Sequence, residues 1–297
     1  MRAFLLLLLL FKIAFSEEYV YSNVLMLPSH LKAIIVSKSH QKLIVVQLKE
    51  GYPVVLDEMV SITGLRFGDK IQKGDMRTPS GVYFPVSFKP GYTLPSYYGE
   101  GAFPLNYPNA LDKYILRRTG TGIWIHGSEK KELLFFSSKG CVILKNGDLK
   151  KLSNYIFLKK TPVIIQERFL RLPVSEYKKY QKKVLDFLEK WKDALLKLYN
   201  GDTEVLYNLY SPHFYSKYGT RYDQLQIYKK NLYSVGGNKP FVQFVNSMAF
   251  IDKRKNGKEY FAVYTQIGFL SGDEIRTAKK VIYLSADSMK ILTEENF

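Results

Sequence analysis

The sequence lacks a second cysteine. Cys141 is the only one among 297 residues, so no disulfide can form within the chain. In exported proteins, structural cysteines normally come in pairs. A single cysteine is then either a small buried hydrophobic residue or a reactive thiol, and composition alone leaves both alternatives open.

Metal-binding patterns are also missing. The histidines, which are His30, His40, His126 and His213, show no ligand spacing to one another or to a second cysteine. The H-E-x-x-H motif of zinc peptidases does not occur either. The sequence therefore argues against a metalloenzyme.

Acidic residues are scarce relative to basic ones. The chain has 27 Asp and Glu against 44 Lys and Arg, a formal net charge of +17. Such a charge favours an anionic partner. No homeodomain, zinc-finger or RNP-type signature is present, so the partner is not expected to be nucleic acid. Anionic polymers of the cell envelope fit the charge better.

Long hydrophobic runs are absent beyond the N-terminus. There, Arg2 precedes an apolar run over residues 3–11, and Ala14 and Ser16 place small residues before a possible cut ahead of Glu17. This pattern predicts a secretory signal peptide over residues 1–16. The run is short for a bilayer and Lys12 interrupts it, so an uncleaved anchor is the weaker alternative. No stable membrane span is expected after cleavage.

The first part of the chain has the pattern of β-strands. Two β-branched runs within residues 32–48 surround a polar tetrad, which predicts a strand, a turn and a second strand. Residues 53–64 continue the pattern. Residues 70–88 follow, with turn signals from Gly74 to Gly81 that lead into another apolar strand. Further strands are expected at 114–118, 122–127 and 141–145. Residues 89–112 are dense in Gly, Pro and Tyr without any period, as in a binding loop or lid.

The composition changes after residue 170. Residues 175–199 carry apolar side chains at helical spacing, at Val184, Leu185, Leu188, Trp191, Leu195 and Leu198. Short helices are expected within 204–218 and 222–234, and strands from 241 to 296, with turns at 256–257 and 271–272. This order predicts two domains. The predicted divisions are 17–31 (N-terminal segment), 32–168 (first domain), 169–175 (linker) and 176–297 (second domain).

The chemistry-bearing residues lie close together in the sequence. Cys141 follows His126 by fifteen positions, and two adjacent strands joined by residues 129–138 would bring them side by side. Imidazole titrates near the pH at which it can take the thiol proton, so His126 is the predicted base and Cys141 the nucleophile. A backbone carbonyl such as that of Gly127 is the predicted orienter of His126. The backbone N–H groups of Gly140 and Cys141 are the predicted oxyanion donors.

Several ordered motifs now define a resemblance. They are Gly74-Asp75, Thr78-Pro79 with Gly81-Val82-Tyr83, Ala102 to Asn109, His126-Gly127-Ser128, and Ser138-Lys139-Gly140-Cys141-Val142. Together, over residues 32–166, they resemble the L,D-transpeptidase catalytic domain, the YkuD family, and its proteobacterial branch. The resemblance implies a β-rich sandwich, a periplasmic location and peptidoglycan stem peptides as substrate.

In the chemistry that the resemblance implies, the cysteine attacks the bond between the third stem residue and D-Ala. D-Ala leaves, and a thioester remains on Cys141. Transfer to water trims the tetrapeptide to a tripeptide, whereas transfer to an amine makes a 3-3 cross-link. Trimming is favoured, no cofactor is needed, and the oligomeric state stays open.

One position departs from the family pattern. Many members carry arginine two positions after the cysteine, where this chain has Ile143. Arg117, Arg118 or Lys139 is the predicted replacement, with a solvated surface charge as the alternative for each. Ser138 either contacts substrate or stabilises its turn. Tyr98 is a further predicted substrate contact. It belongs to the Tyr-rich stretch over residues 92–107, which is either a lid or a packed surface loop.

The second domain resembles the nuclear-transport-factor-two-like cone, an α+β fold with helices first and a curved antiparallel sheet after them. This pairing with the catalytic domain is similar to envelope L,D-carboxypeptidases of helical epsilonproteobacteria. Aromatic residues of this domain line a pocket or belong to its core, with core favoured; they are Tyr207, Tyr210, Phe214, Tyr215 and Tyr218. A non-catalytic wall-binding scaffold is the competing function. A papain-like protease is disfavoured, because its cysteine motif is absent.

Overall fold

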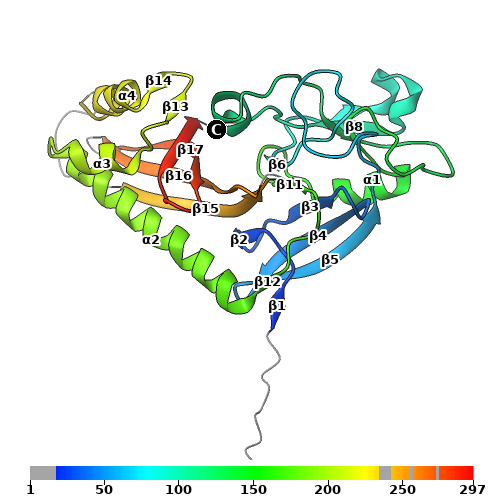
Figure 1. Ribbon diagram of the computed structural model, residues 1–297, viewed down its shortest axis with the longest axis horizontal. Coiled ribbons are helices and arrows are strands. Elements are labelled where there is room, and N and C mark those ends of the chain that lie inside the picture. The colour runs from blue at the N-terminus through cyan, green and yellow to red at the C-terminus, as the bar shows by residue number, and fades with distance from the viewer. Residues whose placement is uncertain (1–17, 234–241, 255–256, 272–273, 297) are drawn as a thin grey trace, which may run out of the picture.

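The computed structural model describes residues 18–233, 242–254, 257–271 and 274–296. The predicted signal peptide, residues 1–16, lies outside the described residues. Among the described helices, none combines the length and the apolar character that a bilayer crossing requires. Two units lie side by side, one built on residues 31–166 (the first unit) and one on residues 174–296 with strand β2 (the second unit) (Figure 1).

The first unit contains two sheets. The strands of the larger sheet, in spatial order, are β5 (Tyr52–Val60), β4 (Lys42–Lys49), β3 (Ala33–Ser37), β11 (Val163–Gln166) and β6 (Gly81–Tyr83). Those of the smaller sheet are β10 (Val142–Ile143), β9 (Trp124–His126), β8 (Gly101–Pro104) and β7 (Lys89–Pro90). The two sheets face each other, so this unit is a β-rich sandwich. The strand, turn and strand predicted for residues 32–48 are confirmed as β3 and β4.

The central strand β3 is covered on both faces, which explains its unbroken apolar sequence. Ile34 and Val36 pack toward the smaller sheet in a core that includes Phe103 and Ile125. Helix α1 (Asn146–Ser153) closes this core with Leu149 and Leu152. The alternate β3 residues, Ala33 and Ile35, point into a different core, shared with the second unit.

Helices cover one face of the sheet in the second unit. The sheet has the order β18 (Ile291–Asn296), β17 (Glu274–Ser285), β16 (Glu259–Ser271), β15 (Val242–Lys253) and β2 (Val24–Met26). The helices are α2 (Val174–Tyr199), α3 (Glu204–Leu209) and α4 (Arg221–Tyr233). The helical prediction for residues 175–199 is confirmed, although Leu185 is 49% exposed and does not face the core. Of the aromatic residues of this unit, Tyr210 and Phe214 are buried, whereas Tyr215 and Tyr218 are exposed.

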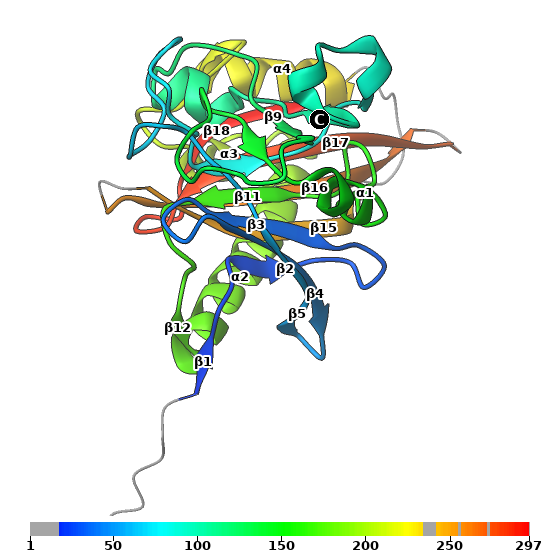
Figure 2. The ribbon, with the colours of Figure 1, turned by 90° about the vertical axis from the view of Figure 1, so that its right-hand side faces the viewer.

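The opposite face of this sheet packs on the first unit. Phe250 and Tyr264 join Ala33 and Phe84 in one buried cluster. Viewed from the first unit, β3, β4 and β11 lie in front of β15 and β16 (Figure 2). The sheet is thus apolar on both faces and holds the two units together.

The N-terminal segment also joins the two units, through the pairing of its strands. Strand β2 pairs with β15, with Val24 opposite Phe250, although β2 precedes the entire first unit in sequence. Strand β1 (Tyr19–Val20) pairs with β12 (Leu172–Pro173), which lies in the predicted linker. The predicted domain boundaries remain predictions.

Two sequence predictions are wrong in the first unit. Residues 114–118, predicted as a strand, overlap the π-helical turn η3 (Leu111–Ile115). Asn109 and Asp112 accept each other's backbone N–H at 3.0 and 3.3 Å, which fixes a helical start there. Residues 89–112, predicted as irregular, contain β7, β8 and the 3-10 turns η1 (Gly91–Thr93) and η2 (Ser96–Tyr98).

The first of the two short helices predicted in the second unit ends earlier than predicted. Helix α3 stops at Leu209, and residues 210–218 contain the short strand β13 (Tyr215–Ser216), which pairs with β14 (Gly219–Thr220).

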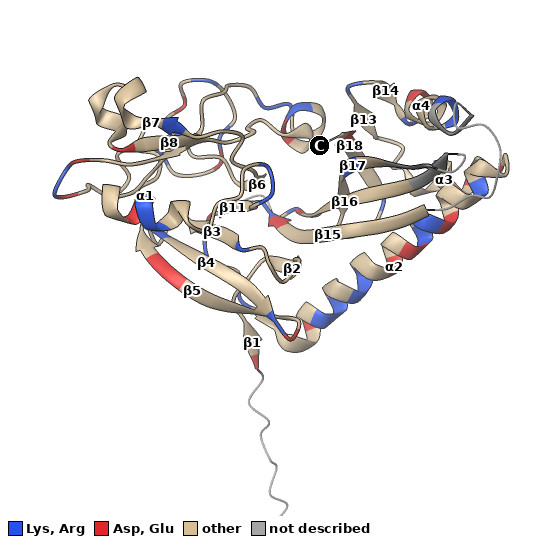
Figure 3. Cartoon of the chain, turned by 180° about the vertical axis from the view of Figure 1, so that it is seen from behind, with Lys and Arg blue, Asp and Glu red and all other residues tan. Residues whose placement is uncertain are grey.

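Positive charge spreads over both units, and α2 carries acidic and basic residues along its length (Figure 3).

Candidate active site

The predicted nucleophile and base lie on neighbouring strands. Strands β9 and β10 pair in parallel, with Ile143 opposite His126 and Val142 opposite Ile125. Cys141 directly precedes β10, so it lies level with Trp124 at the start of β9, and His126 follows two residues further along β9. The predicted adjacency of the two strands is confirmed, and the contact between the side chains of His126 and Cys141 stays a prediction.

His126 is held in one orientation. Its side chain is 5% exposed, and its Nδ1 lies 2.7 Å from the carbonyl oxygen of Gly127. A carbonyl only accepts hydrogen bonds, so Nδ1 carries the proton and Nε2 is left as the basic nitrogen. The ring of Tyr98 meets the imidazole edge-on, with centroids 4.8 Å apart. The structure thus places Gly127 where the predicted orienter is required.

The environment keeps the pair neutral at rest. Burial raises the pKa of the Cys141 thiol, while the Trp124 amide and the charge of Lys70 act in the opposite direction. Burial also lowers the pKa of His126, against the effect of the Gly127 carbonyl. The sulfur lies 3.6 Å from the carbonyl oxygen of Gly122, as a thiol donor would. The arrangement therefore favours a thiol beside a neutral imidazole, with proton transfer during attack.

The turn before Cys141 is closed by Ser138. Its hydroxyl donates to the carbonyl oxygen of Cys141 at 2.6 Å and accepts the N–H of Gly140 at 3.0 Å. Of the two predicted roles of Ser138, turn stabilisation is the one these bonds perform. They also correct the oxyanion prediction, because the Gly140 amide is engaged within the turn. The Cys141 amide then remains as the predicted donor.

Gly140 is required for backbone reasons instead. Its φ of 127° is in the region that side-chain-bearing residues avoid, and a Cβ there would lie 2.9 Å from the carbonyl oxygen of Arg77. Thr78 fixes the same turn from outside, since its hydroxyl donates to the carbonyl oxygen of Gly140 at 2.9 Å. The Thr-Pro motif thus supports the cysteine turn directly.

The Gly-Asp motif builds a buried ion pair near the thiol. Asp75 lies 2.7 Å from Nζ of Lys70 and accepts the backbone N–H groups of Ile71, Gln72 and Arg77. These contacts hold the pKa of Asp75 down to about 2, against the effect of burial. Lys70 was not predicted from sequence, because no local pattern marks a lysine that will be buried.

Aromatic rings form one wall of the site. Tyr98 packs against Trp124 in a tilted arrangement with centroids 5.0 Å apart, and Lys89 lies 6.0 Å from the centre of the Trp124 ring. Burial, together with Tyr97 and the Cys141 charge, raises the pKa of Tyr98 to about 12. Tyr98 is therefore a neutral hydroxyl beside the reacting groups, which fits its predicted substrate contact. Trp124 was missed by sequence reasoning.

The basic residues predicted to replace the family arginine lie in three different places. The prediction that Arg118 contacts substrate is wrong. Its guanidinium is largely buried and pairs with Asp69 at 2.5 Å and with Asp112 at 3.5 Å. Arg117 lies over the ring of Tyr215 in the second unit, 5.4 Å from its centre. Lys139 is exposed in the cysteine turn and is the one of the three adjacent to the nucleophile. Within the described residues, no group of three or more His, Cys, Asp or Glu could hold a metal ion.

Comparisons with known proteins agree with this geometry. Residues 31–165 match the model of the L,D-transpeptidase catalytic domain, the YkuD family. The resemblance predicted from the motifs is confirmed for this segment. A search of curated proteins gives no match.

Two solved structures are similar over both units. Bd1075 from Bdellovibrio bacteriovorus is 28% identical with a TM-score of 0.75, covering 94% of this chain and 98% of its own. The helical cell shape determining protein Pgp2 from Campylobacter jejuni is 24% identical with a TM-score of 0.71, covering 94% of each chain. The likeness to Pgp2, at 24% identity, shows a shared fold. The family match supports a role in modifying peptidoglycan.

Proposed function

We propose that this protein is an L,D-carboxypeptidase that trims peptidoglycan tetrapeptides to tripeptides through a thioester on Cys141. The observation that carries the proposal is the parallel pairing of β10, which follows Cys141, with β9, which ends in His126, together with the hydrogen bond from Nδ1 of His126 to the Gly127 carbonyl. A non-catalytic scaffold has no need of an oriented base beside a lone thiol.

The first half-reaction forms the thioester. Nε2 of His126 takes the thiol proton while the sulfur of Cys141 attacks the carbonyl carbon of the third stem residue. The negative charge that develops on the carbonyl oxygen is stabilised by the Cys141 amide. As the intermediate collapses, the C–N bond breaks and His126 returns the proton to the departing D-Ala amine.

The second half-reaction releases the acyl group. His126 takes a proton from water, the resulting hydroxide attacks the thioester carbonyl, and the C–S bond breaks to give a carboxylic acid and the thiol again. An amine of another stem in place of water would give a 3-3 cross-link. Water is favoured by the predicted pairing with a nuclear-transport-factor-two-like unit, which resembles the carboxypeptidase branch.

The place of action follows from the substrate. Peptidoglycan lies outside the cytoplasmic membrane, so the protein is proposed to work in the periplasm after export by residues 1–16. A contribution to cell shape is part of the proposal, since a fold relative, Pgp2, is a helical cell shape determining protein. Lys139, exposed beside Cys141, is the proposed partner of a stem carboxylate.

The test is incubation of purified disaccharide-tetrapeptide, and of its cross-linked dimers, with the mature protein and with Cys141→Ala. Mass spectrometry is expected to show loss of one D-Ala with the wild type and no change with the variant. New 3-3 dimers would instead establish a transpeptidase. If the wild type gives neither product on either substrate, the catalytic proposal is wrong and the wall-binding scaffold replaces it.

A further inference from the structure

Large apolar side chains are exposed on two loops beside the cysteine turn. The loop that follows β5 and the loop between β9 and β10 lie side by side there. The backbone N–H of Leu65 donates to the carbonyl oxygen of Ser138 at 2.8 Å, and the ring centroids of Phe67 and Phe136 are 4.8 Å apart. We call the exposed apolar side chains of these two loops the loop patch; they are Leu65, Phe67, Ile71, Leu134 and Phe135.

The side chains of the loop patch are turned to solvent. Leu134 is 74% exposed, Phe67 is 62% exposed and Phe135 is 60% exposed. Leu134 and Phe135 are neighbours in a stretch without helix or strand, so the period of an amphipathic element does not explain them. A single exposed apolar residue is ordinary, but several on adjoining loops mark a surface that contacts a protein or a membrane.

The loops that form the patch also carry unpaired cations. Their carboxylates Asp69 and Asp75 are engaged in ion pairs, which leaves Glu129 and Glu132 as the remaining acidic groups. The basic side chains take no part in ion pairs among the described residues; beyond Lys139, the proposed substrate contact, they are Arg66, Lys73, Arg77, Lys130 and Lys131. The apolar patch is therefore set in a positively charged surface, which attracts an anionic partner.

A hollow of about 370 Å³ adjoins the patch and is lined by Phe67, Ile71 and Arg77. Nε of Arg77 is buried and has no hydrogen-bond partner among the described residues. Other charged groups that line the hollow already pair with one another; they are Asp69, Arg118 and Arg254. An unpaired guanidinium beside apolar side chains suits a phospholipid, because its phosphate lies next to its acyl chains.

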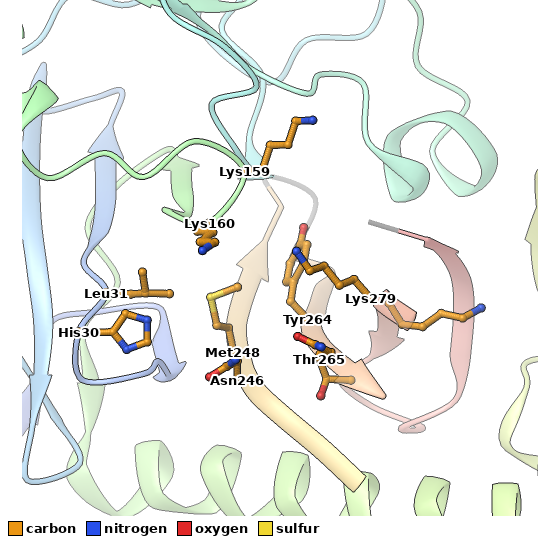
Figure 4. A pocket seen from close by; sticks show the side chains of 11 residues that line it. His30, Leu31, Lys159, Lys160, Asn246, Met248, Tyr264, Thr265 and Lys279 are labelled. Atoms are coloured by element: carbon orange, nitrogen blue, oxygen red, sulfur yellow. The ribbon is translucent and has the colours of Figure 1, made fainter. Parts of the chain in front are cut away.

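Two other surfaces or partners fit less well. A second copy of this chain also has a net charge of +17, so repulsion between the cations opposes its approach. Lysines also surround the hollow shown in Figure 4, but its apolar residues Met248 and Tyr264 are only 7% and 2% exposed. Those two side chains cannot reach into a bilayer, whereas the side chains of the loop patch protrude.

We propose that the loop patch docks this protein on a bilayer surface rich in anionic phospholipid. The apolar side chains enter the boundary between headgroups and acyl chains, while the surrounding lysines and arginines stay at the level of the headgroups. Docking holds the cysteine turn beside the bilayer, because Leu65 is hydrogen-bonded to Ser138. Lipid binding does not require catalysis, so the docking surface is independent of the proposed reaction.

The experiment measures sedimentation of the mature protein, residues 17–297, with two kinds of vesicle. Binding is expected for vesicles of phosphatidylglycerol and phosphatidylethanolamine, and to be about tenfold weaker for phosphatidylcholine alone. Leu134→Gln with Phe135→Gln is expected to weaken binding to the anionic vesicles about tenfold. The matched control, Leu185→Gln with Tyr222→Gln, removes exposed apolar side chains from α2 and α4 and is expected to bind as the wild type does.

A second measurement tests whether the patch enters the bilayer. Brominated acyl chains quench tryptophan fluorescence only where the indole reaches the hydrocarbon. Phe135→Trp is expected to be quenched more than the wild type on brominated phosphatidylglycerol vesicles, and Leu185→Trp, on α2, is expected to match the wild type. Raising the salt from about 0.1 M to about 1 M is expected to weaken binding, because the ions screen the attraction of the cations.

Three results would overturn the proposal. They are equal vesicle binding of the patch variant and its control, equal wild-type binding to anionic and zwitterionic vesicles, and a patch-dependent dimer in place of vesicle binding. Cys141→Ala is expected to bind vesicles as the wild type does. Failure of the proposed function is therefore seen separately, as absence of tripeptide from the soluble substrate. Circular dichroism and the unfolding midpoint of each variant exclude misfolding as the cause of lost binding.

Discussion

The guanidinium of Arg254, at the end of β15 in the second unit, donates a hydrogen bond to the backbone carbonyl of Ser80 in the first unit. Two residues before Ser80, Thr78 holds the carbonyl of Gly140, next to the nucleophile. Arg254 also pairs with Asp252 at 2.6 Å and with Asp112 at 3.4 Å, and it is 3% exposed. A residue of the second unit therefore helps to position the cysteine turn.

Arg254→Met is expected to lower the free energy of unfolding by about 3 kcal/mol, because it leaves buried carboxylates without their cation. Below the unfolding temperature, kcat for tripeptide release is expected to fall while KM changes little, since Arg254 acts through the turn. Arg254→Lys is expected to recover part of the activity. The exposed neighbour change Lys253→Met serves as the control, and equal kinetics for the two methionine variants would contradict the positioning role.

His126→Gln is expected to reduce kcat by about 10²- to 10⁴-fold without unfolding the protein, as loss of a general base does. Gln keeps a polar side chain near the Gly127 carbonyl but cannot take the thiol proton. Single-turnover thioester formation, followed by mass spectrometry of the intact protein, measures the effect. Wild-type rates in the variant would exclude His126 as the base.

The acid limb of kcat/KM is expected to have a midpoint below 6.5, the ordinary value for histidine. Burial lowers the pKa of His126, so the neutral, basic form persists to lower pH and activity is lost only below that shifted pKa. The measurement is a pH profile of tripeptide release on the soluble substrate. A midpoint at or above 6.5 would show that the imidazole is not desolvated in the free enzyme.

Asp75→Asn is expected to destabilise the protein by about 2 kcal/mol at neutral pH, since it leaves Lys70 buried without a counter-charge. The folded pKa of Asp75 is about 2, below its ordinary 3.8, so the stabilisation is complete above 3.8 and is lost as pH falls through about 2. Denaturant unfolding between pH 2 and 7 tests this. Asp186→Asn, which breaks an exposed pair with Lys182, is the matched control and is expected to change little.

Ser138→Ala is expected to lower kcat more than tenfold and stability by about 1 kcal/mol, because the turn loses two hydrogen bonds. The adjacent Ser137→Ala removes one exposed bond to the carbonyl of Leu134 and is the control. Kinetics and thermal unfolding of both variants make the comparison. An active, equally stable Ser138→Ala protein would mean that the turn holds its shape without the hydroxyl.

Local patterns were sufficient to predict a large part of the fold. The β-branched runs of β3 and β4 and the helical spacing of α2 are signals within a few residues, and the structure confirms both. Strand β8 was not predicted, since its Gly-Ala-Phe-Pro sequence has little strand character and is held by pairing with β9. The pairing of β2 with β15 joins residues more than 220 positions apart, and no local pattern encodes it.

The candidate site also contains residues that the sequence predicts and residues that it does not. His126 and Cys141 were predicted from motif and spacing, whereas the destinations of the basic residues were not. Arg118 has the composition of a surface arginine in sequence, and its burial against Asp69 depends on residues from a distant loop. The sequence shows that a side chain is charged, but the tertiary packing decides whether water or a carboxylate surrounds that charge.

The pairing of strand β2, which precedes the first unit, with β15 of the second unit has a consequence for protein synthesis. Because β2 is made first and its partner β15 near the end, the second sheet cannot be completed until most of the chain has emerged. Until then the outward-facing Ile35 and Phe84 have no cover, and a truncated chain ending near residue 168 would leave them exposed to water. Such a fragment is expected to aggregate, so the two units together, with strand β2, are the smallest piece expected to fold on its own.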